Sequence, residues 1–383
     1  MSCSVPQAST VLSIDLAALV RNYAFLARQV PKALCAAVVK ADAYGLGVAH
    51  IAPALEGAGV REFFVAHVDE GLFLRPLLSQ QSHITVLHAC SPEVIDICFA
   101  HNLRPVLNSL DHISWVRSMA HLRGQKINVA LQIDTGMSRL GLPPTEIESL
   151  IENPTALDGL SLSLIMSHLA CADTPHHPAN AQQRARFCHY TTLLPQAPLS
   201  LAASSGIFLG ENYHFNLVRP GAALYGINPL FEQPNPLEAV VQLQAPILQI
   251  RTLNKGDCVG YGLTWQADKR HRVATIGIGY AHGFARRGAA QGCAWFKGYR
   301  LPILGRISMD SMAVDISNVP ESQFQGERKV DLLNKTYGVD DLAKAQGTIG
   351  YEILTSFGQC SHRFYTNDSY SAKKEIGCLQ HAS

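Results

Sequence analysis

Apolar and polar residues alternate with a strand–helix pattern over the first part of the chain. Between residues 33 and 220, short apolar or β-branched runs are separated by amphipathic stretches of roughly 10 to 15 residues. This alternation predicts strands joined by helices. The predicted strands cover residues 33–40, 63–67, 84–88, 103–108, 127–134, 160–168, 199–204 and 215–219.

Eight such strands predict an α/β fold with an N-terminal (β/α)8 TIM-like barrel. The parallel strands of such a barrel are covered on both faces, and the predicted strands are mostly apolar along their length. A doubly wound open sheet would produce the same alternation, so it remains the structural alternative.

The pattern changes after Tyr225. Residues 228–236 are rich in Asn and Pro, which predicts a linker. We therefore predict a barrel domain over 11–235, a mainly β domain over 236–366 and a frayed polar tail over 367–383. Within the β domain, strand-like runs separated by Gly-rich turns lie at 240–251, 257–261, 271–277 and 300–306.

Composition narrows the class of protein. The 31 Lys and Arg residues nearly balance 30 Asp and Glu and form no basic block, which argues against nucleic-acid binding. Apolar residues at 47% and charged residues at 16% exclude a disordered chain. No apolar run approaches the roughly 18 residues of a membrane span. We expect neither a nucleic acid nor a membrane as a partner.

The cysteines and the first residues of the chain indicate the cellular compartment of the protein. The 10 cysteines are scattered, with no CxxC pair and no zinc spacing. The start of the chain lacks the basic and apolar regions of a secretory signal. These features predict a cytoplasmic protein with free thiols and no metal site.

Chemically useful side chains close several predicted strands, and the carboxyl ends of the strands form the working face of a barrel. The strand at 33–40 ends on Lys40, which is either a solvent-facing lysine or a desolvated amine suited to a Schiff base. Arg139 is either a surface arginine or a bidentate carboxylate ligand. His168 is either a core histidine or a general base.

Small residues follow the last two predicted strands, with Ser-Ser-Gly at 204–206 and Arg-Pro-Gly-Ala at 219–222. Backbone N–H groups and a hydroxyl at this place in a barrel can bind a phosphate, although the same residues also suit ordinary turns. A phosphate cradle and an amine on one barrel face together suggest pyridoxal phosphate. A serine nucleophile is disfavoured because no GxSxG motif is present.

Motifs in both predicted domains resemble those of the alanine racemase family, from about residue 13 to residue 357. The resemblance implies a pyridoxal-phosphate enzyme built from a barrel and a β domain, in which the first strand, 12–16, joins the β domain. The motifs are AVVKADAYG at 37–45, DTGMSRLG at 134–141, RPG at 219–221, GYG at 260–262, GIGY at 277–280, GRISMD at 305–310 and YEIL at 351–354.

The resemblance also implies a role for each site residue. Lys40 would carry the cofactor, and Tyr261 of a second subunit would stand opposite it as the other base. His168 and Asp310 would assist Tyr261, because a tyrosine with a pKa near 10 is a poor base at neutral pH. The other implied contacts are Tyr44, Ser205, Gly221, Ala222 and Tyr351 to the phosphate, Arg219 to the pyridine nitrogen, Arg139 and Met309 to the substrate carboxylate, and Tyr280 in the entrance channel.

Together these roles imply interconversion of L- and D-alanine by two bases on opposite faces of a carbanion, within a homodimer that shares its active sites. The product D-alanine would supply peptidoglycan. The alternatives are a broader racemase that accepts serine, a barrel-type decarboxylase, against which Arg219 argues, and a catalytically silent cofactor-binding protein. Taken apart from the surrounding glycines and the barrel motifs, Tyr261 and Tyr280 would be a pair of core aromatics of the β domain.

The sequence departs from the family pattern at two positions near the implied site. Gln132 stands where the family often has a modifiable lysine, so it cannot supply a negative charge to Arg139. Its carbonyl oxygen could still accept a hydrogen bond from that arginine. Ser204 stands where the family often has asparagine, which could alter the size of the pocket and the range of substrates.

Overall fold

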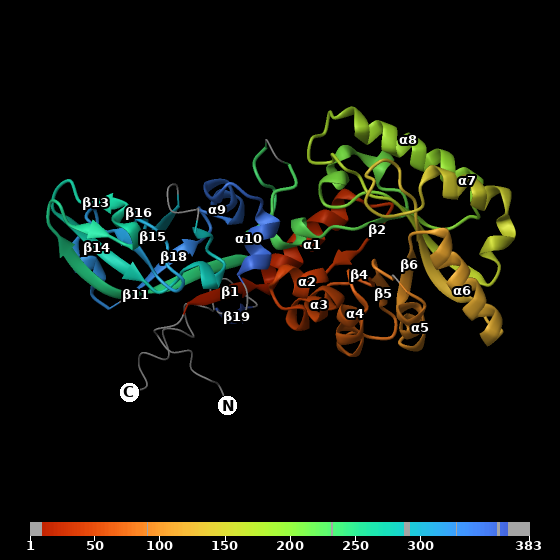
Figure 1. Cartoon of the computed structure of the whole chain (residues 1–383), viewed down its shortest axis with the longest axis horizontal. Coiled ribbons are helices and arrows are strands. Elements are labelled where there is room, and N and C mark those ends of the chain that lie inside the picture. Colours follow the sequence, from red (N-terminus) through yellow and green to blue (C-terminus); the bar gives the residue numbers. More distant parts are fainter. Residues whose placement is uncertain are drawn as a thin grey trace. The chain divides into compact units, whose positions relative to one another are not determined.

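The computed structural model describes residues 10–89, 91–230, 233–286, 292–326, 328–357 and 361–366. The chain forms two compact units, which are described separately (Figure 1). The barrel unit comprises Leu19–Leu224 and Asn228–Leu237. The sheet unit comprises the chain through Ala18, Tyr225–Ile227 and the chain from Glu238. The predicted tail at 367–383 lies outside the described residues.

Parallel strands form the centre of the barrel unit. Seven of them are hydrogen-bonded in chain order from β3 to β9, and β10 pairs in parallel with β2. The Val38 N–H donates to Pro220 O, and the Arg219 N–H donates to Ala202 O, both at 2.9 Å, which closes the ring. The strands are β2 (Leu34–Cys35), β3 (Ala37–Val38), β4 (Glu62–Val65), β5 (His83–Val86), β6 (Arg104–Leu107), β7 (Ile127–Gln132), β8 (Leu160–Met166), β9 (Leu199–Ser200) and β10 (Leu217–Val218).

The predicted barrel is therefore confirmed, and the open-sheet alternative is wrong. The main difference lies at the predicted strand 33–40, which is interrupted at Ala36 to give β2 and β3. Most of the predicted strands also extend one or more residues too far at their carboxyl ends. The ladder ends there because the chain turns away to form the loops that carry the polar side chains.

Helices and one left-handed turn, α2, connect the strands of the ring, and a buried cluster that includes Ile113, Ile147 and Phe187 joins three of the helices to the strands. Sequence signals begin these helices: Ser91 caps α5 by accepting from the Val94 N–H, with a proline at the first helical position. The helices are α1 (Leu16–Gln29), α2 (Lys40–Tyr44), α3 (Val48–Gly57), α4 (Val68–Leu74), α5 (Pro92–Ala100), α6 (Leu110–Arg123), α7 (Pro144–Glu152) and α8 (Pro178–Leu193).

The interior of the ring is mostly apolar and also holds an ion pair between Glu62 and Arg104. Phe64, Val106 and Leu164 pack together inside. Glu62 and Arg104 lie two residues before the first two of these, so they share the inner face. Arg104 is paired with Glu62 and also donates to the Thr85 hydroxyl at 2.9 Å and the Ser163 hydroxyl at 3.3 Å. These contacts satisfy the charge that the barrel buries.

Antiparallel strands form most of the sheet unit. The strand order is β14-β17-β16-β15-β18-β11-β1-β19, and β11 also pairs with β14, which closes six of the strands into a ring. β1 runs between β11 and β19. The strands are β1 (Val11–Asp15), β11 (Val241–Leu253), β14 (His271–Ile276), β15 (Cys293–Phe296), β16 (Tyr299–Leu304), β17 (Met312–Asp315), β18 (Lys329–Leu333) and β19 (His362–Thr366).

The sheet unit departs from the sequence prediction in several places. The predicted strand 257–261 is only β12 (Cys258–Val259), because Gly260 adopts a φ of 75° that ends it, and β12 pairs with β13 (Trp265–Gln266). The prediction missed β15, β17, β18 and β19. It also missed two helices, α9 (Val339–Gln346) and α10 (Gly350–Ser356).

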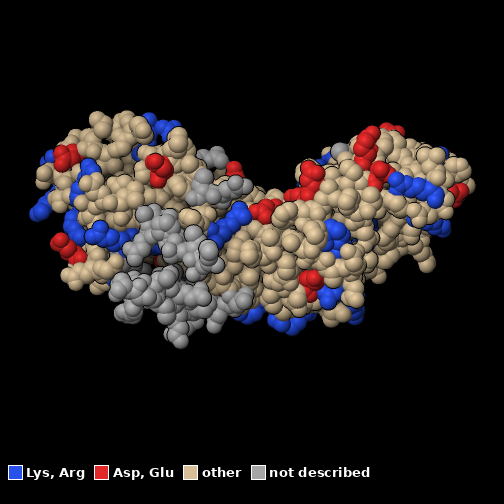
Figure 2. Space-filling view, turned by 90° about the horizontal axis from the view of Figure 1, so that it is seen from below, with Lys and Arg blue, Asp and Glu red and all other residues tan. Residues whose placement is uncertain are grey.

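The surface carries charges of both signs. On the face drawn in Figure 2, basic and acidic side chains are interspersed with uncharged surface over the described residues. None of the helices in the described ranges combines the length and hydropathy needed to cross a bilayer.

Candidate active site

Lys40 begins an unusual turn at the end of β3. Ala41, Asp42, Ala43 and Tyr44 all have positive φ values, between 53° and 57°, which makes a left-handed turn of non-glycine residues. Such a conformation costs roughly 1–2 kcal/mol per residue. Backbone strain of this kind persists only where the surroundings impose it, and it concentrates at functional sites.

Glu70 of α4 supplies much of that support. Its Oε1 accepts from the Ala41 N–H at 2.5 Å, and its Oε2 accepts from the N–H groups of Ala66 at 2.7 Å and His67 at 3.0 Å. One carboxylate therefore ties the lysine turn to the end of β4. Glu70 could not be recognised from the sequence, because an acidic residue in the first turn of a helix is typical of an ordinary cap.

The amine of Lys40 lies in a half-buried, cationic environment. Burial lowers the pKa of Lys40, and the charge of Arg139 lowers it further, whereas the charge of Glu70 raises it. His88, at the end of β5, has its pKa lowered by burial and then by His67, Lys40 and Arg139. The rings of His67 and His88 are 4.9 Å apart. This histidine pair could not be recognised from the sequence, because the two residues come together only through the pairing of β4 with β5.

His168 follows β8 and is partly buried. Burial lowers its pKa to about 3, with smaller contributions from the charges of Arg219, Arg139 and Lys40. The imidazole is therefore neutral at pH 7. Gln183, buried in α8, fixes the turn by donating to His168 O at 3.0 Å.

Arg219 is buried at the end of β10. It donates to the Ser200 hydroxyl and, at 2.6 Å, to Ser167 O. No carboxylate in the described ranges forms an ion pair with it, and burial lowers its pKa to about 10. A cation is therefore held in the barrel by neutral acceptors alone.

Arg139 lies in an exposed turn after β7. Asp134 shapes that turn, because its Oδ1 accepts from the N–H groups of Gly136, Met137 and Ser138 at 2.8–3.1 Å. Gln132 Nε2 donates to Leu140 O at 3.1 Å. Gln132 therefore supports the turn through the backbone next to Arg139.

Tyr44, Ser204 and Gly221 meet at the carboxyl ends of the last two strands. The Ser204 hydroxyl accepts from the N–H groups of Gly221 at 3.1 Å and Ala223 at 3.2 Å. A Cβ on Gly221 would lie 2.3 Å from Tyr44 Oη, so only glycine fits there. Ser205 and Ala222 begin the adjacent 3-10 turns η3 (Ser205–Leu209) and η5 (Ala222–Tyr225). Hydroxyls and backbone N–H groups here form a cradle suited to an anion.

The other predicted site residues lie in the sheet unit and are exposed. Tyr280 and Met309 are neighbours, since the Tyr280 N–H donates to Ser308 O at 3.1 Å and the Ala281 N–H donates to Met309 O at 2.8 Å. The alternative that Tyr261 and Tyr280 are core aromatics is wrong, because their exposed fractions are 70% and 42%. Asp310 and Tyr351 are likewise exposed.

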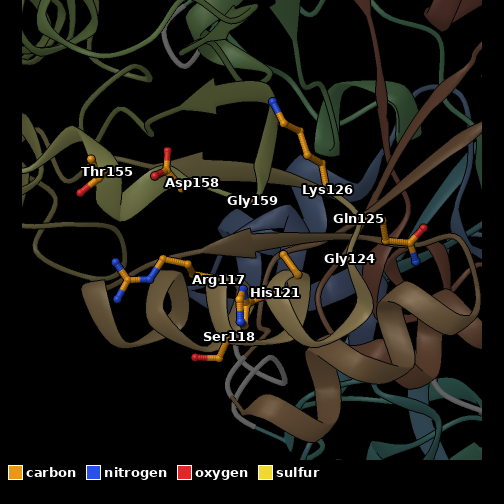
Figure 3. Close-up of a pocket in the computed structure, with 10 residues that line it drawn as sticks. Arg117, Ser118, His121, Gly124, Gln125, Lys126, Thr155, Asp158 and Gly159 are labelled. Carbon is orange, nitrogen blue, oxygen red and sulfur yellow. The ribbon is translucent and has the colours of Figure 1, made fainter.

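A cavity of about 650 Å³ lies elsewhere in the barrel unit (Figure 3). Arg117, His121, Lys126 and Asp158 line it, at the C-terminal end of α6 and the amino ends of β7 and β8. It contains none of the predicted site residues. Because barrel enzymes work at the carboxyl ends of the strands, this cavity is not the active site.

In the described ranges, no three His, Cys, Asp or Glu side chains are grouped so that they could hold a metal ion. The six described cysteines are free thiols. A strained lysine turn, a buried arginine and a group of hydroxyls and backbone N–H groups lie at the same edge of the barrel. This combination is what we expect of a barrel enzyme that binds anionic small molecules.

Comparison with known proteins makes the class specific. The alanine racemase N-terminal domain matches residues 14–229, and the alanine racemase C-terminal domain matches residues 240–365. The chain belongs to the alanine racemase family. The family resemblance seen in the sequence is confirmed, and with it the assignment to the amino-acid racemases.

Individual relatives agree. The chain is 48% identical to a protein of Mesorhizobium japonicum named "Alanine racemase, catabolic", over 94% of this chain and 93% of that one. It is 44% identical to an alanine racemase of Rhodospirillum rubrum, over 94% of this chain and 96% of that one. Among solved structures, alanine racemase from Bartonella henselae with covalently bound pyridoxal phosphate matches with a TM-score of 0.90 and 39% identity, over 94% of this chain and all of that one.

Proposed function

We propose that this chain is a pyridoxal-phosphate-dependent alanine racemase that interconverts L- and D-alanine with two bases. The observation that carries the proposal is the Lys40 amine, half-buried at the edge of the barrel and with its pKa lowered by burial and by Arg139. When bound, the cofactor supplies the electron sink that makes the α-proton of an amino acid acidic. The protein then has to bind, orient and exchange protons.

The residues around Lys40 fit this cofactor. The proposed phosphate ligands are Tyr44, Ser205, Gly221, Ala222 and Tyr351, and the first four lie at the cradle described above. Arg219 is proposed to face the pyridine nitrogen. A buried cation disfavours a proton on that nitrogen, which limits delocalisation of charge and argues against decarboxylation.

Lys40 and Tyr261 are the proposed bases. Lys40 serves one face of the substrate carbon, and Tyr261 of a second subunit serves the other. His168 is proposed to assist Tyr261, and its neutral imidazole offers one donor and one acceptor at pH 7. Asp310 is proposed as a second helper of Tyr261.

Exposed side chains of the sheet unit support a homodimer with shared sites. Tyr261, Leu263, Met309 and Ile349 have exposed fractions of 70%, 65%, 58% and 60%. Large apolar side chains exposed in this number are typical of a surface that another chain covers. In the proposed dimer, each sheet unit completes the partner's barrel site.

Arg139 and the backbone of Met309 are proposed to receive the substrate carboxylate, and Tyr280 to narrow the entrance. Alanine is the proposed substrate. An apolar pocket discriminates only modestly against a substrate that carries an additional hydroxyl, so serine is the alternative substrate. Rates with L-alanine and L-serine measured side by side separate the two.

The proposed role is supply of D-alanine for peptidoglycan in the cytoplasm, where reducing conditions keep thiols free. A catabolic role is the second candidate, because the relatives named catabolic are 48% and 46% identical to this chain. Rescue of a D-alanine auxotroph supports the first role. Growth on alanine as carbon source that depends on this gene supports the second.

The proposed function is tested with purified protein and added pyridoxal phosphate. We expect a visible absorbance band of a lysine-bound cofactor, and loss of optical rotation when L-alanine is added. Lys40→Ala should lose both the band and turnover. Turnover that persists in this variant would falsify the assignment of Lys40.

A further inference from the structure

Tyr261 lies in a loop that needs an anchor. Residues 260–264 close the hairpin between β12 and β13, in which Val259 faces Trp265. Gly260, Gly262 and Leu263 all have positive φ values. Two strands alone are marginally stable in water, so this hairpin by itself does not fix a catalytic side chain.

His271 provides a second attachment. Its ring lies 5.2 Å from that of Trp265 in an edge-on contact with an interplanar angle of 80°. Its Nδ1 lies 2.9 Å from Asp315 Oδ2 on β17, and its Nε2 lies 2.7 Å from Asp268 Oδ1 in the turn after β13. A single buried imidazole therefore joins both the hairpin and the turn that follows it to the main sheet.

The charges around His271 favour its doubly protonated form. A neutral imidazole has one N–H and would turn a lone pair toward one of the two carboxylates. The hydrogen bond to Asp268 is the main reason that the pKa of His271 is raised; burial opposes the rise, and Asp315 adds to it. The pKa of Asp268 is lowered mainly by its hydrogen bond to His271, and the charge of Lys269 lowers it slightly further. The residue opposite His271 on β11 is Leu253, which is apolar.

We propose that His271, held by Asp268 and Asp315, is a positioning residue for Tyr261. The inference rests on the proposed role of Tyr261 as the second base. His271 acts through Trp265 and the hairpin rather than on the substrate. A displaced base loses hydrogen-bond reach to its proton, so the rate falls although substrate binding does not.

Kinetics of the holoenzyme test the proposal. His271→Gln can satisfy only one of the two carboxylates, and Asp268→Asn leaves the ring in place but removes one charge. Asp173→Asn, an exposed change in the barrel unit, is the control. We expect kcat to fall about tenfold in His271→Gln and less in Asp268→Asn, with unchanged KM for alanine and unchanged cofactor absorbance.

Isotope effects distinguish positioning from general damage. Each base removes the α-proton of one enantiomer. A misplaced Tyr261 therefore raises the α-deuterium effect for one enantiomer only, the same one that Tyr261→Phe affects. Equal changes for both enantiomers, or kcat values within about twofold of the Asp173→Asn control in both variants, overturn the proposal.

Fluorescence gives a readout that does not depend on turnover. A protonated imidazole quenches a neighbouring indole, so Trp265 emission should rise as the pH passes upward through the pKa of His271. This rise should be absent in His271→Gln. Both proteins also carry Trp115→Phe, because Trp115 lies 5.1 Å from another histidine, His112, and would add a signal of its own.

Full racemisation by Tyr261→Phe would contradict the proposed function itself. That result differs from one in which only the His271 variants behave like the wild type, which would contradict the positioning role alone.

Discussion

Glu70 Oε1 accepts a hydrogen bond at 2.5 Å from the backbone N–H of Ala41, the residue that follows Lys40. The same carboxylate caps the end of β4 through two further N–H groups. The left-handed turn that carries the lysine is thus fixed from a neighbouring strand–helix junction. Residues that never touch the substrate set the position of the amine.

Removal of Glu70 should therefore impair catalysis. In Glu70→Ala the strained turn relaxes, and we expect kcat/KM for alanine to fall about 10- to 100-fold. Asp69→Ala removes the neighbouring acid from the same helical turn and is the matched control. Racemisation assays on both variants check the prediction, which fails if the two retain the same activity.

Gly221→Ala should weaken the cofactor site. The added Cβ would lie 2.3 Å from Tyr44 Oη, and overpacking of this kind costs roughly 1–3 kcal/mol. We expect the affinity for pyridoxal phosphate to fall about 5- to 150-fold in an absorbance titration. Gly57→Ala has nothing within 4 Å of its Cβ and should bind normally.

A second variant tests the cause of that loss. Tyr44→Phe removes the obstructing hydroxyl, so Gly221→Ala should cost less affinity in the Tyr44→Phe background than in the wild type. Equal losses in the two backgrounds would show that the contact with Tyr44 is not the reason.

Acid should destabilise the fold through His168. Its pKa of about 3 in the folded chain lies below the ordinary 6.5, so the unfolded chain binds more protons between these values. The free energy of unfolding therefore increases as the pH rises through this window, by at most about 1.4 kcal/mol per pH unit. The same stabilisation is lost as the pH falls through it.

Urea unfolding between pH 7 and pH 4 measures this slope. His168→Gln removes the contribution and should give a shallower dependence than the wild type. Gly57→Ala, which changes no titratable group, should keep the wild-type slope. A wild-type slope in His168→Gln would contradict the assignment.

The barrel was predictable because each of its strands is a short apolar run that local periodicity reveals. Lys40 and His168 could be found because they end such runs, and Arg139 because it lies in the turn that follows one, at the edge where this fold places its chemistry. β15 and β17 could not be found in this way. Their pairing with β16 and β14 is decided by the tertiary structure of the sheet rather than by a local pattern.

Contacts between distant residues were also hidden from the sequence. Asp315 is 44 residues from His271, and Glu70 is 29 residues from Ala41. An isolated Glu or His has ordinary explanations, and only the tertiary structure shows which residue it supports. The family resemblance named the residues expected to touch cofactor and substrate. It did not name Glu70 or His271.

The central claim is that Lys40 of one subunit and Tyr261 of another complete a single racemase site. Mixing two inactive variants tests it most directly. Lys40→Ala and Tyr261→Phe are unfolded together, refolded at equal amounts, and assayed with L-alanine. In a random mixture half of the dimers are mixed, and each mixed dimer has one intact site, so about a quarter of the wild-type activity should return. If the mixture stays as inactive as its parents although mixed dimers form, the shared site is contradicted.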